Sequence, residues 1–155
     1  MCTGVEVEDE AEKILRGWYR KSKKGSPKCI SFRIDDGLFV VEKQSDGSKS
    51  PKEQFNDFKD SFTPVQTRIW LAKVSYDKNG QTREDIVYLL RKGRVTKDYF
   101  KAVGKPAAKK LKNDIIIYAM SGKVLKGLVP PKYVHEYEDK DADYDTIAKA
   151  LADRL

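Results

Sequence analysis

The strongest local folding signal in this chain is a pair of β-type segments joined at Asn79-Gly80. The stretch "TRIWLAKVSYDKNGQTREDIVYLL" (residues 67–90) is rich in β-branched and aromatic residues on both sides of that dipeptide. Asn-Gly suits the positive φ angles of a two-residue hairpin turn, so the stretch predicts two antiparallel strands. Any fold proposed for the chain must therefore contain a β-sheet.

Helix and strand signals alternate on either side of this hairpin. Residues 28–43, "KCISFRIDDGLFVVEK", contain two short β-rich runs around an Asp-Asp-Gly turn, which predicts a second hairpin. Residues 50–62 begin with Ser50 as a helix cap and a proline in the first helical position, and Glu53 completes a capping box. Residues 132–139 alternate between apolar and polar side chains, as a strand does.

Three segments predict helices with one apolar face. Residues 5–24 open with acidic side chains and close with basic ones, and both ends suit the helix dipole. Residues 50–62 and the terminal stretch 143–155 follow the same apolar spacing. The side chains expected to face the core are Ala11, Ile14, Leu15 and Trp18 in the first helix, Phe55, Phe58 and Phe62 in the second, and Tyr144, Ile147 and Leu151 in the last.

The order of these elements predicts a single α/β domain of the α+β type. A chain of 155 residues is long enough to bury a core unaided, and it shows neither internal repeats nor a boundary between domains. We expect one domain over residues 1–155, with a central mixed β-sheet of about five strands flanked by four or five helices.

Charge is concentrated in one stretch of the chain. The net charge is +7, which favours an acidic partner: a nucleic acid, a phosphoinositide surface or an acidic protein. Residues 91–112 hold nine Lys or Arg and one acid, a local net of +8. Glycine and Pro106 punctuate the stretch, so we interpret residues 91–111 as an extended basic loop that carries a short helix around residues 96–103.

The sequence offers little for catalysis. Cys2 and Cys29 are too few for a disulfide scaffold or a zinc site, and they fit a reducing compartment. His135 is expected to be a structural side chain in an alternating strand, and no glycine-rich phosphate loop follows a strand. We therefore expect no enzyme activity, no cofactor and no metal. No apolar run is long enough to span a membrane, and no secretory signal is evident.

Residues 113–128, "NDIIIYAMSGKVLKGL", begin like a strand and end like a helix. Read as a helix, one face holds apolar side chains expected to turn toward the core: Ile117, Tyr118, Ser121, Val124, Leu125 and Leu128. The opposite face holds Lys112, Ile116, Ala119, Met120 and Lys123, a mixture of apolar and charged side chains that is typical of a docking surface. The alternatives are a buried strand, or a helix covered on both faces.

Four of these stretches resemble, in order, the actin-depolymerising factor/cofilin family. The opening "MCTGVEVEDEAEKIL" is similar to the family's Met-x-Ser-Gly-Val-x-Val start, and "IIYAMSGKVLKGL" to its Met-Ile-Tyr-Ala-Ser-Ser-Lys helix. The hairpin "VSYDKNGQTREDIVYLL" and the terminal "YDTIAKAL" match the family's strands and last helix. The resemblance covers almost the whole chain. It implies an actin-depolymerising-factor homology fold that binds actin monomers and filaments, promotes filament depolymerisation or severing, and catalyses nothing.

The resemblance also implies two sets of site residues. The monomer-binding face would comprise Thr3, Gly4, Val5, Lys112, Ile116, Met120 and Lys123. The filament-side face would comprise Lys78, Arg83, Lys149 and Arg154. Thr3 stands where the family carries a regulatory serine, so it is a candidate for phosphorylation, which would add about −1.5 to −2 charges. The chain departs from the family at Asp114 and Asp153, where bases are usual, and it lacks the Trp-x-Pro-Asp turn after the fourth strand.

Other readings of the sequence remain open. The resemblance implies a monomeric cytoplasmic protein on the cytoskeleton, and it admits a nuclear location. The rival is a phosphoinositide- or nucleic-acid-binding module that uses residues 91–112, where Tyr99 and Phe100 interleave with lysines. Nucleic acid is the less favoured of these ligands, because the stretch holds only two aromatic side chains. Residues 130–133, "PPKY", also match a ligand pattern of WW domains.

Overall fold

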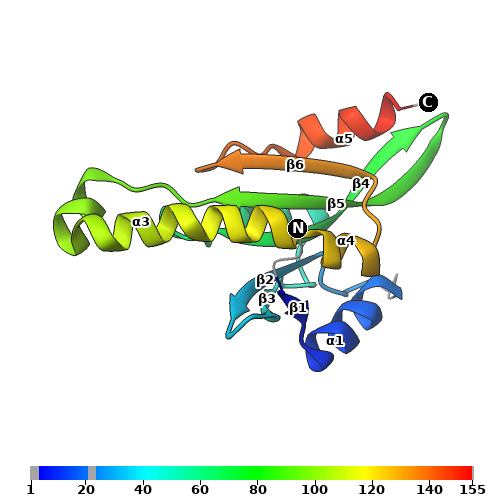
Figure 1. Cartoon of the computed structure of the whole chain (residues 1–155). Coiled ribbons are helices and arrows are strands. Elements are labelled where there is room, and N and C mark those ends of the chain that lie inside the picture. Colours follow the sequence, from blue (N-terminus) through cyan, green and yellow to red (C-terminus); the bar gives the residue numbers. More distant parts are fainter. Residues whose placement is uncertain (1–3, 21–23, 155) are drawn as a thin grey trace.

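The computed structural model describes residues 4–20 and 24–154. They form one α+β domain around a curled, mixed sheet (Figure 1). Its strands are β1 (Glu6–Val7), β2 (Cys29–Asp35), β3 (Leu38–Gln44), β4 (Arg68–Lys78), β5 (Gln81–Lys92) and β6 (Tyr133–Glu138). They lie in the order β1-β3-β2-β4-β5-β6. The two outer pairs, β1 with β3 and β5 with β6, are parallel, and the inner pairs are antiparallel.

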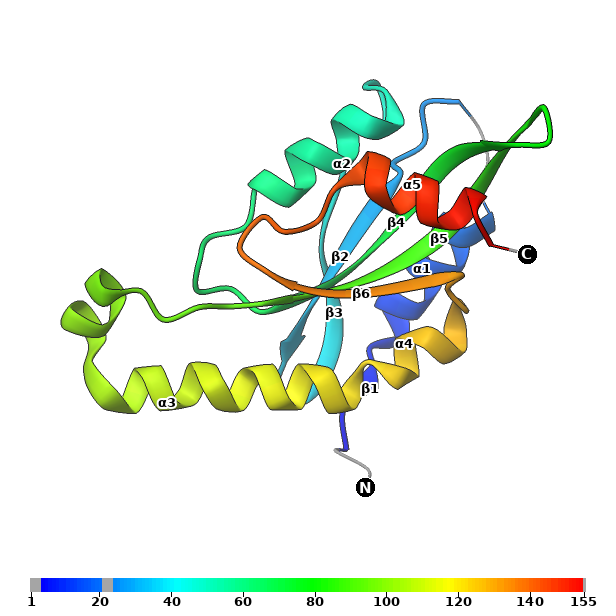
Figure 2. The ribbon, with the colours of Figure 1, turned by 90° about the horizontal axis from the view of Figure 1, so that it is seen from above.

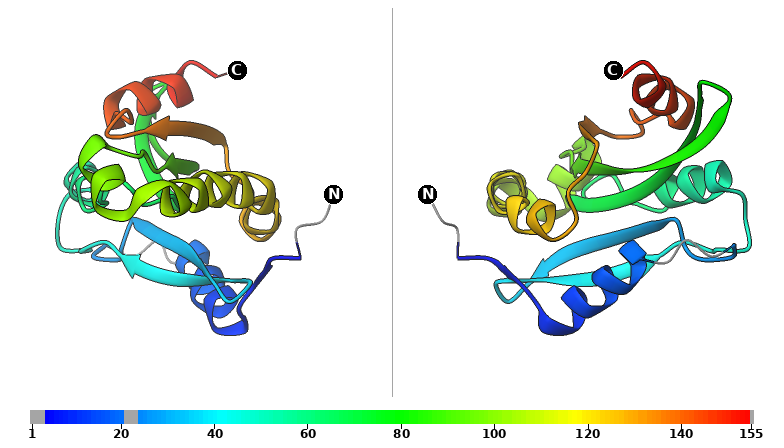
Figure 3. Two further views of the ribbon diagram at one scale, coloured as in Figure 1. Left: turned by 60° about the vertical axis from the view of Figure 1, so that its left-hand side comes forward. Right: turned by 90° about the vertical axis from the view of Figure 1, so that its right-hand side faces the viewer.

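Helices cover both faces of this sheet. They are α1 (Asp9–Arg20), α2 (Pro51–Asp60), α3 (Lys97–Ser121), α4 (Lys123–Leu128) and α5 (Tyr144–Ala152). In the right-hand view of Figure 3, α3 and α4 lie on one side of β4 and β5, while α2 and α5 lie on the other. The expected class, a mixed sheet flanked by helices, is confirmed. The sixth strand is the two-residue β1, too short to give a recognisable sequence pattern.

The two core layers follow from strand alternation. Successive side chains of a strand point to opposite faces, so Ile69 and Leu71 of β4 pack under α3, α4 and α1, whereas Trp70 packs under α2 and α5. The same alternation divides the side chains of β5 between the two faces of the sheet. Every side chain that the sequence assigned inward in the three amphipathic helices is buried or partly buried: Ala11, Ile14, Leu15, Trp18, Phe55, Phe58, Phe62, Tyr144, Ile147 and Leu151.

The predicted Asn79-Gly80 turn and the predicted Ser50 cap are confirmed, and the structure adds a cap at Asp143. Asn79 and Gly80 both adopt positive φ, at 53° and 77°, and join β4 to β5. Ser50 caps α2 by accepting a hydrogen bond from the backbone N–H of Glu53. Asp143 caps α5 by accepting from the backbone N–H of Thr146. Local side-chain chemistry therefore sets these boundaries as the sequence indicated.

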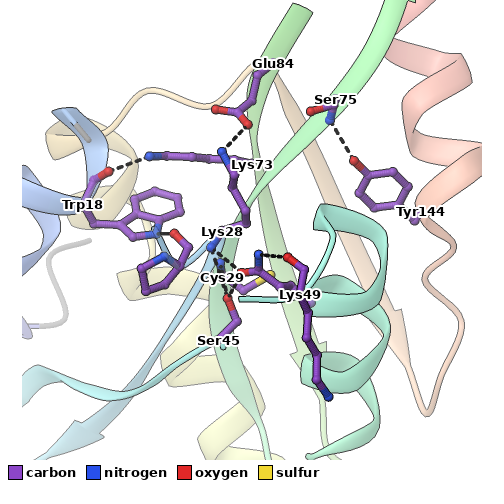
Figure 4. Close-up of polar contacts among 11 residues, drawn as sticks. Trp18, Lys28, Cys29, Ser45, Lys49, Lys73, Ser75, Glu84 and Tyr144 are labelled. Carbon is purple, nitrogen blue, oxygen red and sulfur yellow. Dashed lines mark hydrogen bonds and ion pairs between the residues drawn. The ribbon is translucent and has the colours of Figure 1, made fainter. Parts of the chain in front are cut away.

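A polar network ties α1 and α2 to the end of the sheet (Figure 4). The Lys73 ammonium lies in the core and donates a 2.6 Å hydrogen bond to the carbonyl of Trp18. The backbone N–H of Lys28 donates to the side-chain oxygen of Gln54 at 2.8 Å, and Ser45 shares that oxygen. Burial lowers the pKa of Lys73. These bonds satisfy polar groups that burial would otherwise leave unpaired.

Candidate functional site

The most prominent feature of the surface is α3, whose first half extends beyond the sheet (Figures 1 and 2). Thr96 caps its start by accepting from the backbone N–H of Tyr99. Gly104 interrupts it with φ of 76°, a conformation that favours glycine, and the chain then continues as helix to Ser121. The short helix expected near residues 96–103 is confirmed. The expectation of a loop over residues 91–111 is wrong, because only 93–96 lie outside regular structure.

Arg91, at the start of that basic stretch, does not belong to the surface. It is 2% exposed, and its guanidinium donates a 2.6 Å hydrogen bond to the carbonyl of Gln66. Burial lowers the pKa of this guanidinium. Its guanidinium therefore holds the segment between α2 and β4 in place, and its charge does not face a partner. The surface charge of the stretch comes from Arg94 and from the lysines that follow it on α3.

The inner face of α3 is fixed by Tyr118. Its hydroxyl accepts a 2.8 Å hydrogen bond from the backbone N–H of Ile34, and its ring packs edge-to-face against Phe39. Ala108, Leu111 and Ser121 are buried on the same side. Burial raises the pKa of the Tyr118 hydroxyl. The rotation of the helix about its axis is thereby set, and the opposite side must face solvent.

That opposite side exposes apolar and basic residues together, as the sequence indicated. Ile116 is 56% exposed and Met120 is 40% exposed, and Lys112 and Lys123 are exposed beside them. We call these four residues the α3 outer face. Ile117, expected to face the core, is 39% exposed, so that assignment is wrong. Tyr118 takes the inward position, and the neighbouring Ile117 is rotated by about 100° to the flank.

The helix expected over residues 113–128 exists, but it is divided. α3 ends at Ser121, Gly122 forms the junction, and α4 continues from Lys123 to Leu128. A Cβ on Gly122 would lie 1.8 Å from the Tyr88 hydroxyl oxygen, so only glycine lets the junction approach β5 this closely. The backbone at this point is therefore pressed against the sheet, and the buried-strand alternative for residues 113–128 is wrong.

The N-terminal segment lies beside this junction (Figure 2). Gly4 is exposed, with φ of 77°, next to β1. Val5 was expected on the docking face, but its side chain is 9% exposed and belongs to the core cluster under α4. Thr3 lies outside the described residues. The structure thus brings β1 against α4 and turns the side chain of Val5 into the core.

A second basic surface forms where the β4–β5 hairpin meets α5. The Lys78 ammonium donates a hydrogen bond to the carbonyl of Arg154, which joins the hairpin to the end of the chain. An open hollow here is lined by Lys78, Arg83 and Arg154 together with Tyr76, Asp85, Lys132 and Leu151. Lys149 is exposed on α5 but does not line this hollow. Three of the four residues expected on the filament side therefore share one surface.

The remaining candidate groups serve the structure. The His135 ring stacks between Tyr133 and Tyr137, and its Nε2 lies 2.8 Å from the carbonyl of Asp141. Cys29 is buried, and burial raises the pKa of its thiol, which disfavours the reactive thiolate. Within residues 4–20 and 24–154, no three His, Cys, Asp or Glu side chains could hold a metal ion together. The same residues contain no helix long and apolar enough to cross a membrane.

The last two residues of the proline-rich pattern at residues 130–133 are tied to the sheet. The backbone N–H of Lys132 donates to the carbonyl of Ile86, and Tyr133 opens β6. Tyr133 also packs against the core cluster under α2 and α5. A WW-domain ligand must present its prolines as a free polyproline helix, so the pairing disfavours that reading.

Solved structures share this fold over almost the whole chain. Cofilin of Streptomyces griseoflavus is 18% identical, with a TM-score of 0.67 over 95% of this chain and 97% of that one. Actin depolymerization factor 2 of Plasmodium berghei is 17% identical, with a TM-score of 0.65 over 98% of both chains. Glia maturation factor of Caenorhabditis elegans is 15% identical, with a TM-score of 0.66 over 96% of both. No family model and no curated protein sequence matches the chain. The shared feature is the fold of the actin-depolymerising factor homology domain.

Proposed function

We propose that this protein binds actin monomers through the α3 outer face and the adjoining N-terminal segment. The observation that supports this most directly is the exposure of Ile116 and Met120 on a rigid helix, with Lys112 and Lys123 at the rim. Exposed apolar side chains framed by charges are typical of the centre and rim of a protein interface. The likeness of the fold to that of actin depolymerization factor 2 of Plasmodium berghei supports actin as the partner.

We further propose that the second basic surface contacts actin in filaments. Lys78, Arg83 and Arg154 converge there, about a hairpin that projects from the sheet (Figure 1), and Lys149 lies exposed on α5. A protein with both surfaces promotes filament depolymerisation or severing, because it engages a filament and also holds the released monomer. Such a protein acts as a monomer in the cytoplasm, on the cytoskeleton, and needs no cofactor.

Phosphorylation of Thr3 is proposed as the means of regulating monomer binding. Thr3 lies three positions before β1 in the sequence, and β1 contacts α4. A phosphate would place about −1.5 to −2 charges there. It would repel an acidic partner surface or compete with it for the lysines of the α3 outer face.

The test of the proposed function has two parts. Fluorescently labelled actin monomers are titrated with the protein, and filaments are pelleted with it while both the bound protein and the released monomer are measured. We expect saturable monomer binding, co-sedimentation with filaments and more actin in the supernatant. Monomer binding without any filament effect would restrict the function to sequestering monomers. Absence of both would refute the proposal.

The second candidate is a module that binds phosphoinositides or nucleic acid. The observation that favours it is the exposed charge of the first half of α3, where Phe100 is 44% exposed among lysines. For binding to a nucleic-acid backbone, the logarithm of the binding constant falls steeply and linearly with the logarithm of salt concentration. A salt titration with single-stranded RNA, and another with vesicles that contain phosphoinositides, would distinguish this function from actin binding.

A further inference from the structure

The first half of α3 carries lysines that form no ion pair with the rest of residues 4–20 and 24–154. Lysines elsewhere form ion pairs, such as Lys28 with Glu84, Lys49 with Asp57 and Lys52 with Asp145. Among the described residues, no ion pair includes any of six lysines on this helix: Lys97, Lys101, Lys105, Lys109, Lys110 and Lys112. Four of these six lie on the part of α3 that precedes residue 110, which extends beyond the sheet (Figure 2).

Three of these lysines continue the α3 outer face. From Lys105 to Ser121 the helix has no residue with non-helical backbone angles. Successive steps of three or four residues place side chains on one face of a helix. Such steps join Lys105, Lys109 and Lys112 to Ile116 and Met120. The buried residues Ala108, Leu111 and Tyr118 lie on the other side of the helix. We call Lys105, Lys109 and Lys112 the lysine stripe. With Met120 it spans about 22 Å at 1.5 Å per residue.

The stripe is held in place before any partner arrives. Its backbone is helical, and the same helix is anchored to the sheet through Tyr118 and Leu111. Binding therefore orders the side chains of the lysines but not their backbone, which lowers the entropic cost of making contacts along the whole line. A partner seated on Ile116 and Met120 would meet the stripe in a defined register.

We infer that the lysine stripe contacts an acidic strip on the same actin molecule that covers Ile116 and Met120, and that it strengthens monomer binding through local ion pairs. The inference rests on the proposed function. Lys105, Lys109 and Lys112 share one unbroken helical segment with the apolar pair, whereas the exposed Phe100 and Val103 precede the break at Gly104. A lipid surface would engage lysines together with the exposed apolar side chains at the tip of α3, Phe100 and Val103. Because the stripe instead shares its segment with Ile116 and Met120, the arrangement favours one rigid protein surface as the partner.

The test compares two double variants with the same change in net charge. Lys105→Gln/Lys109→Gln removes two charges from the stripe, and Lys101→Gln/Lys110→Gln removes two from elsewhere on α3. Actin monomer affinity is measured for the whole protein at several salt concentrations. An exposed ion pair contributes about 0.2–1 kcal/mol, so the loss of two pairs should weaken binding by the stripe variant about two- to thirtyfold, with a shallower salt dependence. The control variant should change affinity by less than about twofold.

Several outcomes would overturn the inference. Equal weakening by both variants would mean that only net charge matters, through long-range steering. A stripe variant that binds actin normally but loses binding to vesicles of phosphatidylcholine with phosphatidylinositol bisphosphate would assign the stripe to a lipid surface. In both cases the proposed function would stand, because the unsubstituted protein still binds actin. An unsubstituted protein that binds no actin would overturn the proposed function and the inference together.

Discussion

The backbone N–H of Ile34 donates a 2.8 Å hydrogen bond to the Tyr118 hydroxyl, and this bond joins the end of β2 to the inner face of α3. Ile34 lies 84 positions before Tyr118 in the chain. Tyr118 is flanked along the helix by Ile116 and Met120, which face solvent. The orientation of the α3 outer face therefore depends on Tyr118, whose side chain is buried.

Tyr118→Phe should destabilise the fold while leaving the outer face chemically unchanged. The ring can still pack against Phe39, but the N–H of Ile34 loses its acceptor in a partly buried position. An unsatisfied buried donor costs about 1–3 kcal/mol, which urea denaturation would measure. The control is Tyr19→Phe, because Tyr19 is 49% exposed, and it should change stability by less than about 0.5 kcal/mol. Equal stability of the two variants would mean that the Ile34 bond is unimportant.

Gly122→Ala should disrupt the junction between α3 and α4. The added Cβ would lie 1.8 Å from the Tyr88 hydroxyl oxygen and 3.3 Å from Ile69, so α4 must shift away from the sheet. Overpacking of this kind costs about 1–3 kcal/mol. The matched control is Gly127→Ala in α4, where a Cβ meets nothing within 4 Å and should stabilise the helix by up to about 1 kcal/mol. Thermal unfolding of both variants checks the prediction, and it fails if Gly122→Ala is as stable as Gly127→Ala.

Stability should fall at alkaline pH because of buried tyrosines. Burial raises the pKa of Tyr88, Tyr118, Tyr137 and Tyr144, so these hydroxyls stay protonated in the folded state after the unfolded chain begins to ionise near pH 10. Their contribution is complete below pH 10 and is lost above it. Each such tyrosine then costs at most about 1.4 kcal/mol per pH unit. Lys73 acts in the opposite sense, because its lowered pKa makes the folded state gain stability as pH rises toward 10.

Urea denaturation between pH 8 and 11.5, with absorbance of the tyrosinate form, measures this loss. Tyr118→Phe removes one of the four groups, so its stability should fall less steeply above pH 10 than that of the unsubstituted protein. A stability that stays level to pH 11.5 would show that these hydroxyls do not control alkaline unfolding.

The order of elements could be predicted from the sequence because most of its signals are local. Asn79-Gly80, the Ser50 cap and the apolar spacing of α1 act through neighbouring residues, and the structure confirms them. The first half of α3 could not be recognised in the same way. Gly104 and Pro106 suggested a loop, yet Gly104 is a single break between two helical segments, and Pro106 lies in the first turn after the break, where a proline is tolerated.

The candidate site was predicted in part, for a similar reason. The spacing of Lys112, Ile116 and Met120 along one helix face is local, and all three are exposed as expected. The burial of Val5 and Arg91 depends on the parallel pairing of β1 with β3 and on the carbonyl of Gln66, which are contacts between distant parts of the chain. Extending the helical wheel of α3 backward to Lys105 would have found the lysine stripe, had the helix been assumed to begin earlier.

Arg83→Ala/Lys149→Ala should weaken filament binding without changing monomer affinity. Both side chains are exposed on the β5–α5 side of the molecule, on elements other than α3. Neither forms an ion pair within the described residues, so the fold should lose less than about 0.5 kcal/mol. Co-sedimentation with filaments and a monomer titration are run in parallel. If both assays weaken equally, the two surfaces do not act separately.

Met120→Glu should lower monomer affinity far more than Lys123→Ala does. Interface energy is concentrated in a few desolvated central side chains, while rim charges mainly adjust association rate and salt dependence. A glutamate at position 120 would bury a charge without a partner, which costs several kcal/mol, whereas an exposed rim pair contributes about 0.2–1 kcal/mol. Because Met120 is 40% exposed and points away from the core, both variants should unfold at nearly the same temperature as the unsubstituted protein.

Val134→Glu, which charges a similarly exposed apolar residue on β6, should leave monomer affinity unchanged. The measurements are monomer affinity and thermal stability for all three variants. If Met120→Glu unfolds the protein, the α3 outer face belongs to the core. If Met120→Glu folds and binds actin normally, the proposed docking of actin on α3 is wrong.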